Sequence, residues 1–117
     1  MIQKQVGQNM KESVLIEKSL YFGARILKLY QYLLKTKKET IVSKQIVRSG
    51  TSIGANINEA NYGQSRADFI SKLQIALKEC YETEYWLELM QKADLLPEEI
   101  VKMYLHDCGS IRRMPIA

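Results

Sequence analysis

Two glutamates three residues apart, Glu79 and Glu82, have the residue type and the spacing that acid–base chemistry uses. Paired carboxyl groups can act as a general acid and a general base when they face a substrate together. On a helix, however, residues three apart share one strip of surface, where they can pair with a cation such as Arg48 or Lys72. We therefore interpret the two glutamates as members of an ion-pair network between helices and not as catalytic groups.

The only histidine and the only cysteines of the chain are His106, Cys80 and Cys108. A structural zinc site needs four ligands, commonly in close pairs such as Cys-x-x-Cys, and the chain offers three ligands without that spacing. A di-iron site in a helical bundle needs Glu-x-x-His on two helices, whereas the residue three before His106 is Met103. The sequence therefore predicts no metal site, with the histidine at the surface and two reduced thiols in the core.

A third candidate for chemistry is the stretch RSGTSIGANINEAN, residues 48–61, which is crowded with Ser, Gly, Thr and Asn. Its serines have no partner histidine in the sequence that would activate them as nucleophiles. Its glycines lack the Gly-Lys-Ser/Thr ending of a phosphate-binding loop. We predict that the chain is not an enzyme and that it carries no cofactor.

The composition is typical of a globular protein, with 46% hydrophobic and 26% charged residues. No run approaches the roughly 20 apolar residues that a membrane span needs. The start, MIQKQVGQNMKE, lacks the apolar segment of a signal peptide. Two widely separated cysteines are common in reducing compartments. We expect a cytoplasmic protein without a membrane partner.

Four segments must position these side chains, and each repeats its apolar residues at helical spacing. The segments lie near residues 14–36, 41–61, 66–92 and 98–112. The three connections are short, which makes consecutive helices antiparallel neighbours. The sequence therefore predicts an all-α, up-down-up-down antiparallel four-helix bundle. We expect residues 13–117 to form this one domain and residues 1–12 to form a flexible N-terminus.

The first of these segments carries more apolar surface than a single packing seam requires. One stripe of side chains repeats at i, i+4, i+7 and i+11: Phe22, Ile26, Leu29 and Leu33. A second stripe lies beside it: Leu20, Gly23, Leu27, Tyr30 and Leu34. Together they cover about half of the helix circumference. The extra width suggests a second contact surface, between subunits of an oligomer.

Residues suited to helix N-termini precede the four segments. Ser13 or Ser19 is expected to cap the first helix and Thr40 the second. Ser65 with an acidic residue three positions later resembles a capping box for the third helix. Pro97 suits the first position of the fourth helix.

Polar residues of the second segment form a strip along the flank of its apolar face. Arg48, Ser52 and Glu59 lie on this flank, and Asn56 lies between the flank and the core. The third segment carries a matching strip that includes Glu79, Glu82 and Trp86. Two interpretations are open. The strips satisfy one another between helices, as buried polar groups usually do, or they form a docking surface for a partner protein.

Charge is unevenly distributed along the chain, whose net charge is +4. Residues 1–64 contain ten Lys and Arg against four Asp and Glu, and residues 65–117 contain seven against nine, so the halves carry +6 and −2. A basic face of this kind can bind a nucleic-acid backbone, although ordinary solvated helix faces also carry lysines. The candidate basic face comprises Arg25, Lys28, Lys35, Lys37, Lys38 and Lys44.

Several motifs in order carry a family resemblance. SGTSIGANINEA at residues 49–60 is followed by QSRADFI at 64–70, ALKEC at 76–80 and ETEYWL at 82–87. This series resembles the proteins encoded by intervening sequences in bacterial 23S ribosomal RNA genes, over about residues 14–112. It is similar, more distantly, to the accessory variability determinant of diversity-generating retroelements.

The resemblance implies a four-helix bundle that assembles as a homopentamer and is associated with RNA by the location of its gene. The retroelement relative implies a basic ring that engages reverse transcriptase and nucleic acid. No catalytic residues are implied. We therefore expect a non-enzymatic, homo-oligomeric scaffold, a pentamer, that binds RNA or a nucleic-acid-handling protein. The alternative is a protein–protein interaction module without a nucleic-acid role.

Overall fold

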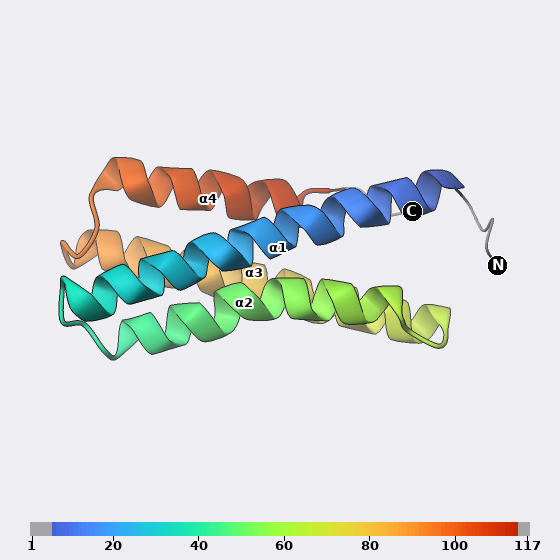
Figure 1. The fold of residues 1–117 in the computed structure, drawn as a ribbon, viewed down its shortest axis with the longest axis horizontal. Helices are drawn as coiled ribbons and strands as arrows, with labels where there is room; N and C mark the ends of the chain where they lie inside the picture. The colour runs from blue at the N-terminus through green and yellow to red at the C-terminus, as the bar shows by residue number, and fades with distance from the viewer. Residues whose placement is uncertain (1–5, 115–117) are drawn as a thin grey trace.

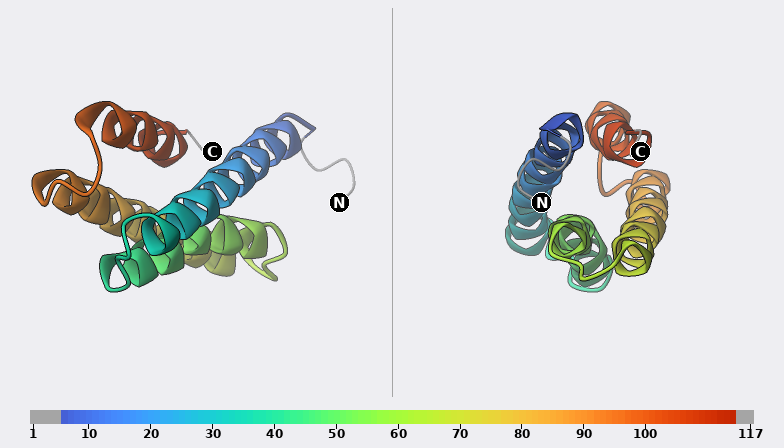
Figure 2. Two further views of the ribbon diagram at one scale, coloured as in Figure 1. Left: turned by 60° about the vertical axis from the view of Figure 1, so that its left-hand side comes forward. Right: turned by 90° about the vertical axis from the view of Figure 1, so that its right-hand side faces the viewer.

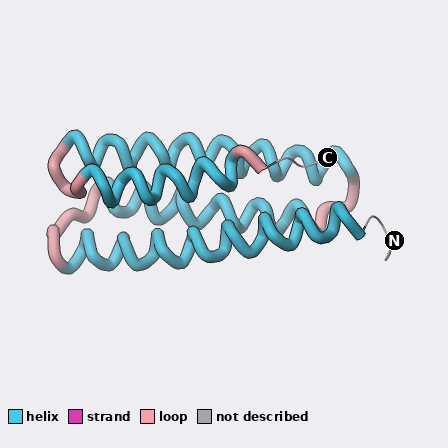
Figure 3. The backbone as a smooth tube through the Cα atoms, turned by 90° about the horizontal axis from the view of Figure 1, so that it is seen from above, coloured by secondary structure: helices cyan, strands magenta, loops and turns pink. Residues whose placement is uncertain are grey.

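Four α-helices account for most of the chain in the computed structural model, which describes residues 6–114. They are α1 (Val6–Lys35), α2 (Val42–Asn61), α3 (Arg66–Lys92) and α4 (Glu98–Arg112). Consecutive helices run in opposite directions, as Figure 1 shows. The α1–α2 and α3–α4 turns lie at one end of the bundle and the α2–α3 turn lies at the other (Figure 3). The predicted all-α four-helix bundle is confirmed.

The helices do not contact one another equally. Helix α2 packs along both α1 and α3, whereas α4 packs mainly on α3 and only lightly on α1. In the end view of Figure 2, α1 and α3 lie on opposite sides of α2, and α4 closes the fourth side. Since α4 has 15 residues against 27 in α3, it covers only part of the bundle. None of the described helices combines the length and apolar character that crossing a membrane requires.

Helix α1 begins earlier than the sequence indicated, at Val6 and not near residue 14. Ser13 and Ser19 therefore lie inside the helix and cap nothing. Ser19 is buried, and its hydroxyl donates a hydrogen bond of 2.9 Å to the carbonyl oxygen of Ile16. Residues 6–12 were expected to be flexible but continue the helix, because most of them are good helix formers. Residues 1–5 lie outside the described residues.

The N-terminus of α2 is capped by a residue that the sequence did not indicate. Thr40 makes no cap, and the expectation was wrong. The carboxylate of Glu39 instead accepts hydrogen bonds from the backbone N–H groups of Ile41, Val42 and Ser43, at 3.0, 3.0 and 2.8 Å. The preceding turn makes this possible, because Lys38 adopts a left-handed conformation with φ of 57°. A carboxylate also suits the positive end of the helix dipole.

Replacing Glu39 with glutamine should lower the free energy of unfolding by about 1 kcal/mol at pH 7, because the cap loses its charge. Partial burial raises the pKa of Glu39, but the hydrogen bonds from Val42, Ser43 and Ile41 outweigh it, so the folded pKa lies below the ordinary 4.5. A lowered folded pKa adds stability above pH 4.5 that disappears as the pH falls through the folded value. Urea unfolding of both proteins at pH 7, 4.5 and 3 should show the difference shrinking.

The exposed Glu17, in the interior of α1, provides the matched control for this prediction. Glu17→Gln removes the same charge without removing a cap, so its stability difference from the wild type should be small at every pH. Equal pH dependence in the two variants would contradict the capping role of Glu39.

The starts of α3 and α4 were better predicted. The Ser65 hydroxyl accepts a hydrogen bond of 3.1 Å from the backbone N–H of Asp68, so the predicted cap of α3 is confirmed. Pro97 precedes α4 as its N-cap residue and not as its first helical residue, a shift of one position. Glu98 and Glu99 lie in the first turn of α4, where carboxylates complement the helix dipole.

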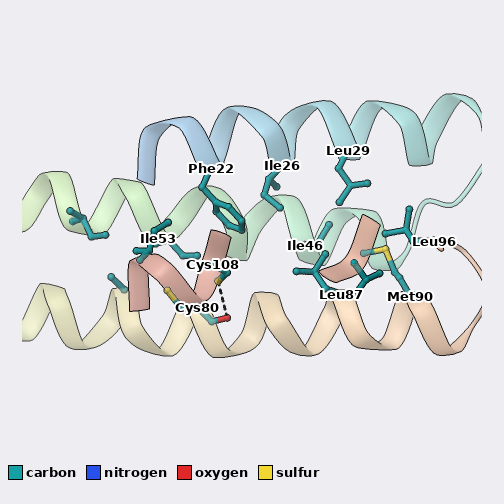
Figure 4. Close-up of a cluster of buried hydrophobic side chains, with 14 of the residues drawn as sticks. Phe22, Ile26, Leu29, Ile46, Ile53, Cys80, Leu87, Met90, Leu96 and Cys108 are labelled. Carbon is teal, nitrogen blue, oxygen red and sulfur yellow. Dashed lines mark hydrogen bonds between the residues drawn. The ribbon is translucent and has the colours of Figure 1, made fainter. Parts of the chain in front are cut away.

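The core runs along the inside of all four helices (Figure 4). Phe22, Ile26, Leu29 and Leu33 of α1 are all buried, as their spacing predicted. The small residues of α2 let its neighbours approach closely. A Cβ atom on the buried Gly50 would lie 2.9 Å from two carbon atoms of Ile26. One position earlier, the buried Ser49 and Thr83 of α3 share a hydrogen bond of 2.8 Å.

Candidate functional site

A polar seam joins α2 to α3 on the outside of the bundle, and Arg48 is its centre. The Arg48 guanidinium lies 3.4 Å from a carboxylate oxygen of Glu79 and also pairs with Glu82. The indole N–H of Trp86 donates a hydrogen bond of 3.0 Å to Glu82. The hydrogen bonds from Arg48 and Trp86 lower the pKa of Glu82, and the bond to Glu82 raises the pKa of Arg48.

The remaining residues of the predicted strip do not join this network. The Asn56 amide donates to Ser52, at 2.9 Å to its carbonyl oxygen and 3.1 Å to its hydroxyl, so both residues bond within α2. Glu59 forms a separate ion pair of 2.8 Å with Lys72 of α3. The strip is therefore a set of local contacts within α2 and between α2 and α3. These contacts are of the kind that the structural interpretation predicts, and the docking interpretation stays a prediction.

The structure brings together only two of the three residues of the hypothetical zinc site. Cys80 and Cys108 are buried opposite each other, with the Cys108 sulfur 3.6 Å from the carbonyl oxygen of Cys80 (Figure 4). Contact with Cys80 and burial raise the pKa of the Cys108 thiol. The side chain of His106, by contrast, is 79% exposed. Among residues 6–114 no group of three or more His, Cys, Asp or Glu side chains is placed to hold a metal ion.

Five of the six residues of the predicted basic face are exposed lysines. Four of these lie where α1 ends and α2 begins, and we call these four the basic corner: Lys35, Lys37, Lys38 and Lys44. Lys28 lies further back along α1. Within the part of the chain that the structure describes, none of these five lysines forms an ion pair. Their charge is available to solvent or to an anionic partner.

Arg25, the sixth residue of the predicted face, has a different environment. Its guanidinium pairs with Asp107 of α4 and lies 5.4 Å from the centre of the Tyr104 ring. These contacts place Arg25 in the packing between α1 and α4. Sequence reasoning missed this because the partners are more than 75 residues away, and helical spacing on α1 does not reveal which helix covers a flank.

Sequence reasoning also missed two features elsewhere on the protein surface. The acidic residues Asp94, Glu98 and Glu99 lie at the α3–α4 turn, at the same end of the bundle as the basic corner (Figure 3). The outer side of α3 carries exposed apolar side chains, including Ile70 and Leu77. Their seven-residue spacing was visible in the sequence, but it was masked by the clearer core seam of the same helix.

The fold and its surfaces define an all-α four-helix bundle whose polar seam is internally paired and whose basic corner holds four exposed lysines without ion pairs among the described residues. Residues 11–117 match the family described as 23S rRNA-intervening sequence protein, and the chain belongs to that family. It is similar to a protein of unknown function from the S23 ribosomal protein family of Bacteroides thetaiotaomicron, known from a crystal structure. The two are 52% identical with a TM-score of 0.88, over 89% of this chain and 93% of that one. No curated protein matches the chain.

Proposed function

We propose that the protein is a non-enzymatic, homo-oligomeric scaffold that binds RNA through the basic corner. The observation that carries this proposal is the gathering of Lys35, Lys37, Lys38 and Lys44, exposed and without ion pairs among the described residues, at one corner of the bundle. Lysine side chains of this kind neutralise backbone phosphates and release counterions, which is the main source of affinity in sequence-independent binding. The family's association with a 23S rRNA intervening sequence makes RNA the partner to test first.

Assembly strengthens the electrostatic argument. One chain carries a formal charge of +4, which by itself gives a weak field. A pentamer, which the family resemblance implies, would carry five basic corners on one rigid body. Several weak contacts to one RNA strand raise the overall affinity well above that of a single contact. The protein–protein alternative, with the polar seam as a docking surface, has less support because Arg48, Glu79 and Glu82 already pair with one another.

The test is RNA binding as a function of salt. We expect a fluorescent RNA of about 30 nucleotides to bind the wild-type protein at about 50 mM salt, with an affinity that falls steeply as salt rises. Lys37→Gln/Lys38→Gln should weaken binding. It should also make the slope of log K against log salt concentration shallower by about 1–2, because each lost phosphate contact lowers the magnitude of that slope by roughly 0.7–0.9. Lys102→Gln/Arg113→Gln, which removes two exposed charges from the α4 side, is the matched control.

Two outcomes would overturn the proposal. One is no binding at about 50 mM salt, or binding that salt does not change, because a phosphate interface cannot behave in that way. The other is equal weakening by the corner variant and the control. Light scattering addresses the scaffold separately: a monomeric wild-type protein would contradict homo-oligomerisation.

A further inference from the structure

The outer side of α1 carries a row of side chains that the bundle leaves partly or largely exposed. Its spacing is 4-3-4-3-4, the repeat that packs one helix against another: Ile16, Leu20, Gly23, Leu27, Tyr30 and Leu34. Leu20 is 71% exposed and Leu27 is 48% exposed. Beside them, small residues such as Gly23 and Gly54 leave a hollow of about 500 Å³ between α1 and α2 that no charged side chain lines. We call this surface the α1 face.

A second apolar surface lies on the outer side of α3. Ile70, Leu77 and Tyr81 are 41%, 40% and 54% exposed, and their positions differ by seven and four residues. They adjoin a hollow of about 380 Å³ beside the C-terminal end of α4, lined largely by apolar side chains such as Phe69 and Leu73. We call this surface the α3 face. The helices that carry the two faces, α1 and α3, lie on opposite sides of α2 (Figure 2).

The two faces lie at about the same height along the bundle. Ile26 of α1 packs against Gly50, and the adjacent Ser49 bonds to Thr83 of α3, so Ile26 and Thr83 are level. Helices α1 and α3 run in the same direction (Figure 1). Leu20 on the α1 face lies six residues before Ile26, and Leu77 on the α3 face lies six residues before Thr83, so Leu20 and Leu77 are level as well. Rotation about an axis parallel to the bundle does not shift a copy along that axis. The α1 face of one copy would therefore lie level with the α3 face of its neighbour.

Charge selects among the three ways in which copies could pair, which are α1 with α1, α3 with α3, and α1 with α3. The half of the chain that contains α1 and α2 carries +6, and the half that contains α3 and α4 carries −2. Pairing α1 with α1 brings two basic halves together, whereas pairing α1 with α3 brings unlike halves together. Locally, Lys28 follows Leu27 of the α1 face in the sequence and is level with Tyr85, about 4.5 Å along the helix from Glu88. Both side chains are exposed, and Lys28 and Glu88 have no ion pair among the described residues.

We propose that the α1 face of one copy packs against the α3 face of the next copy, in the same direction, so that every interface in the assembly is head-to-tail. This inference rests on the homo-oligomer of the proposed function and names the surfaces that build it. Two different faces that meet repeatedly generate a closed ring when the rotation between copies closes. The heptad spacing on both faces supplies the matching rows of side chains that such helix packing needs.

The test separates the faces in two variants. Leu20→Glu/Leu27→Glu blocks the α1 face and Ile70→Glu/Leu77→Glu blocks the α3 face, in each case with a good helix former. Each variant alone should have the mass of the 13.5 kDa monomer in sedimentation velocity or light scattering. Mixed in equal amounts, they should form a 1:1 complex and nothing larger, because each supplies the face that the other lacks. Met103→Glu, at a half-exposed apolar position of α4, should leave the wild-type assembly intact.

The outcomes distinguish this inference from the proposed function. A monomeric wild-type protein contradicts the homo-oligomer itself. A wild-type oligomer that survives both double substitutions overturns the inference and leaves the scaffold standing. If the α3-face variant assembles like the wild type while the α1-face variant does not, copies pair through α1 alone, and the head-to-tail arrangement is wrong. Circular dichroism of each variant, with helix content equal to the wild type, shows that lost assembly does not reflect unfolding.

Discussion

Replacing Gly50 with alanine should lower the free energy of unfolding by about 1–3 kcal/mol, although alanine is the better helix former by about 1 kcal/mol. The reason is the contact between α1 and α2. The new Cβ atom would lie 2.9 Å from both γ carbons of Ile26, closer than carbon atoms can approach. Ile26 is fully buried, in a core where close packing leaves side chains little room to move. The helices must therefore separate or Ile26 must leave its rotamer.

Chemical denaturation of a double-mutant cycle measures this effect. Ile26→Ala removes the atoms that clash and should by itself cost about 2–5 kcal/mol. Gly50→Ala added to Ile26→Ala should then cost little or should stabilise, because the methyl group enters the space that Ile26 vacated. The matched control is Gly23→Ala, whose Cβ would lie 4.0 Å from the nearest atom, the Cα of Thr51. We expect it to be neutral or stabilising by up to about 1 kcal/mol.

All proteins in this cycle must be compared at one concentration, because the proposed assembly would add to the apparent stability. If Gly50→Ala is as stable as Gly23→Ala, the close approach of α1 and α2 at Gly50 is not what the structure indicates. A loss of stability in Gly50→Ala that is the same with and without Ile26 would contradict the named contact.

The fold was largely predictable because apolar spacing alone determines it. The bounds of α3 were predicted because its core seam repeats without interruption and Ser65 caps it. The start of α1 was missed because nothing in residues 6–12 repeats an apolar pattern, and helix propensity carries the helix instead. The Glu39 cap was missed because it depends on the left-handed turn at Lys38, which brings a side chain from before the helix onto its first N–H groups.

The candidate surfaces were predictable only in part, for a physical reason. Helical spacing places residues on a face, and it correctly placed Arg48 and Glu82 on facing flanks of α2 and α3. It does not give the register between helices, and so it did not reveal that Asn56 bonds back to Ser52. Helical spacing also does not show which flanks of a helix are covered by a neighbouring helix. Arg25 was therefore grouped with lysines that form no ion pair among the described residues.

Replacing Phe22 with alanine should have the largest effect on stability, a loss of about 3–5 kcal/mol. Phe22 is 2% exposed, and its ring meets the edge of Tyr104 with the ring centres 6.3 Å apart. The contact between Phe22 and Tyr104 is important for holding α4 against α1, because α4 is short and contacts α1 only lightly. Other links between α1 and α4 are the Tyr104 hydroxyl, which donates to the carbonyl oxygen of Arg25 at 3.1 Å, and the ion pair between Arg25 and Asp107. The Lys18 ammonium also donates a long hydrogen bond of 3.4 Å to the Ser110 hydroxyl.

The substitution should therefore loosen α4 before it unfolds the rest of the bundle, since α2 and α3 keep their own contacts through Ser49 and Thr83. Native-state hydrogen exchange tests this order: in Phe22→Ala, amides of α4 should lose more protection than amides in the middle of α2 and α3. Tyr104→Phe, which removes only the hydrogen bond to Arg25, should cost about 1 kcal/mol and shift α4 in the same direction. If protection falls equally in all four helices, α4 unfolds together with the rest of the bundle as one cooperative unit. In that case the light contact between α4 and α1 does not make α4 the least stable helix.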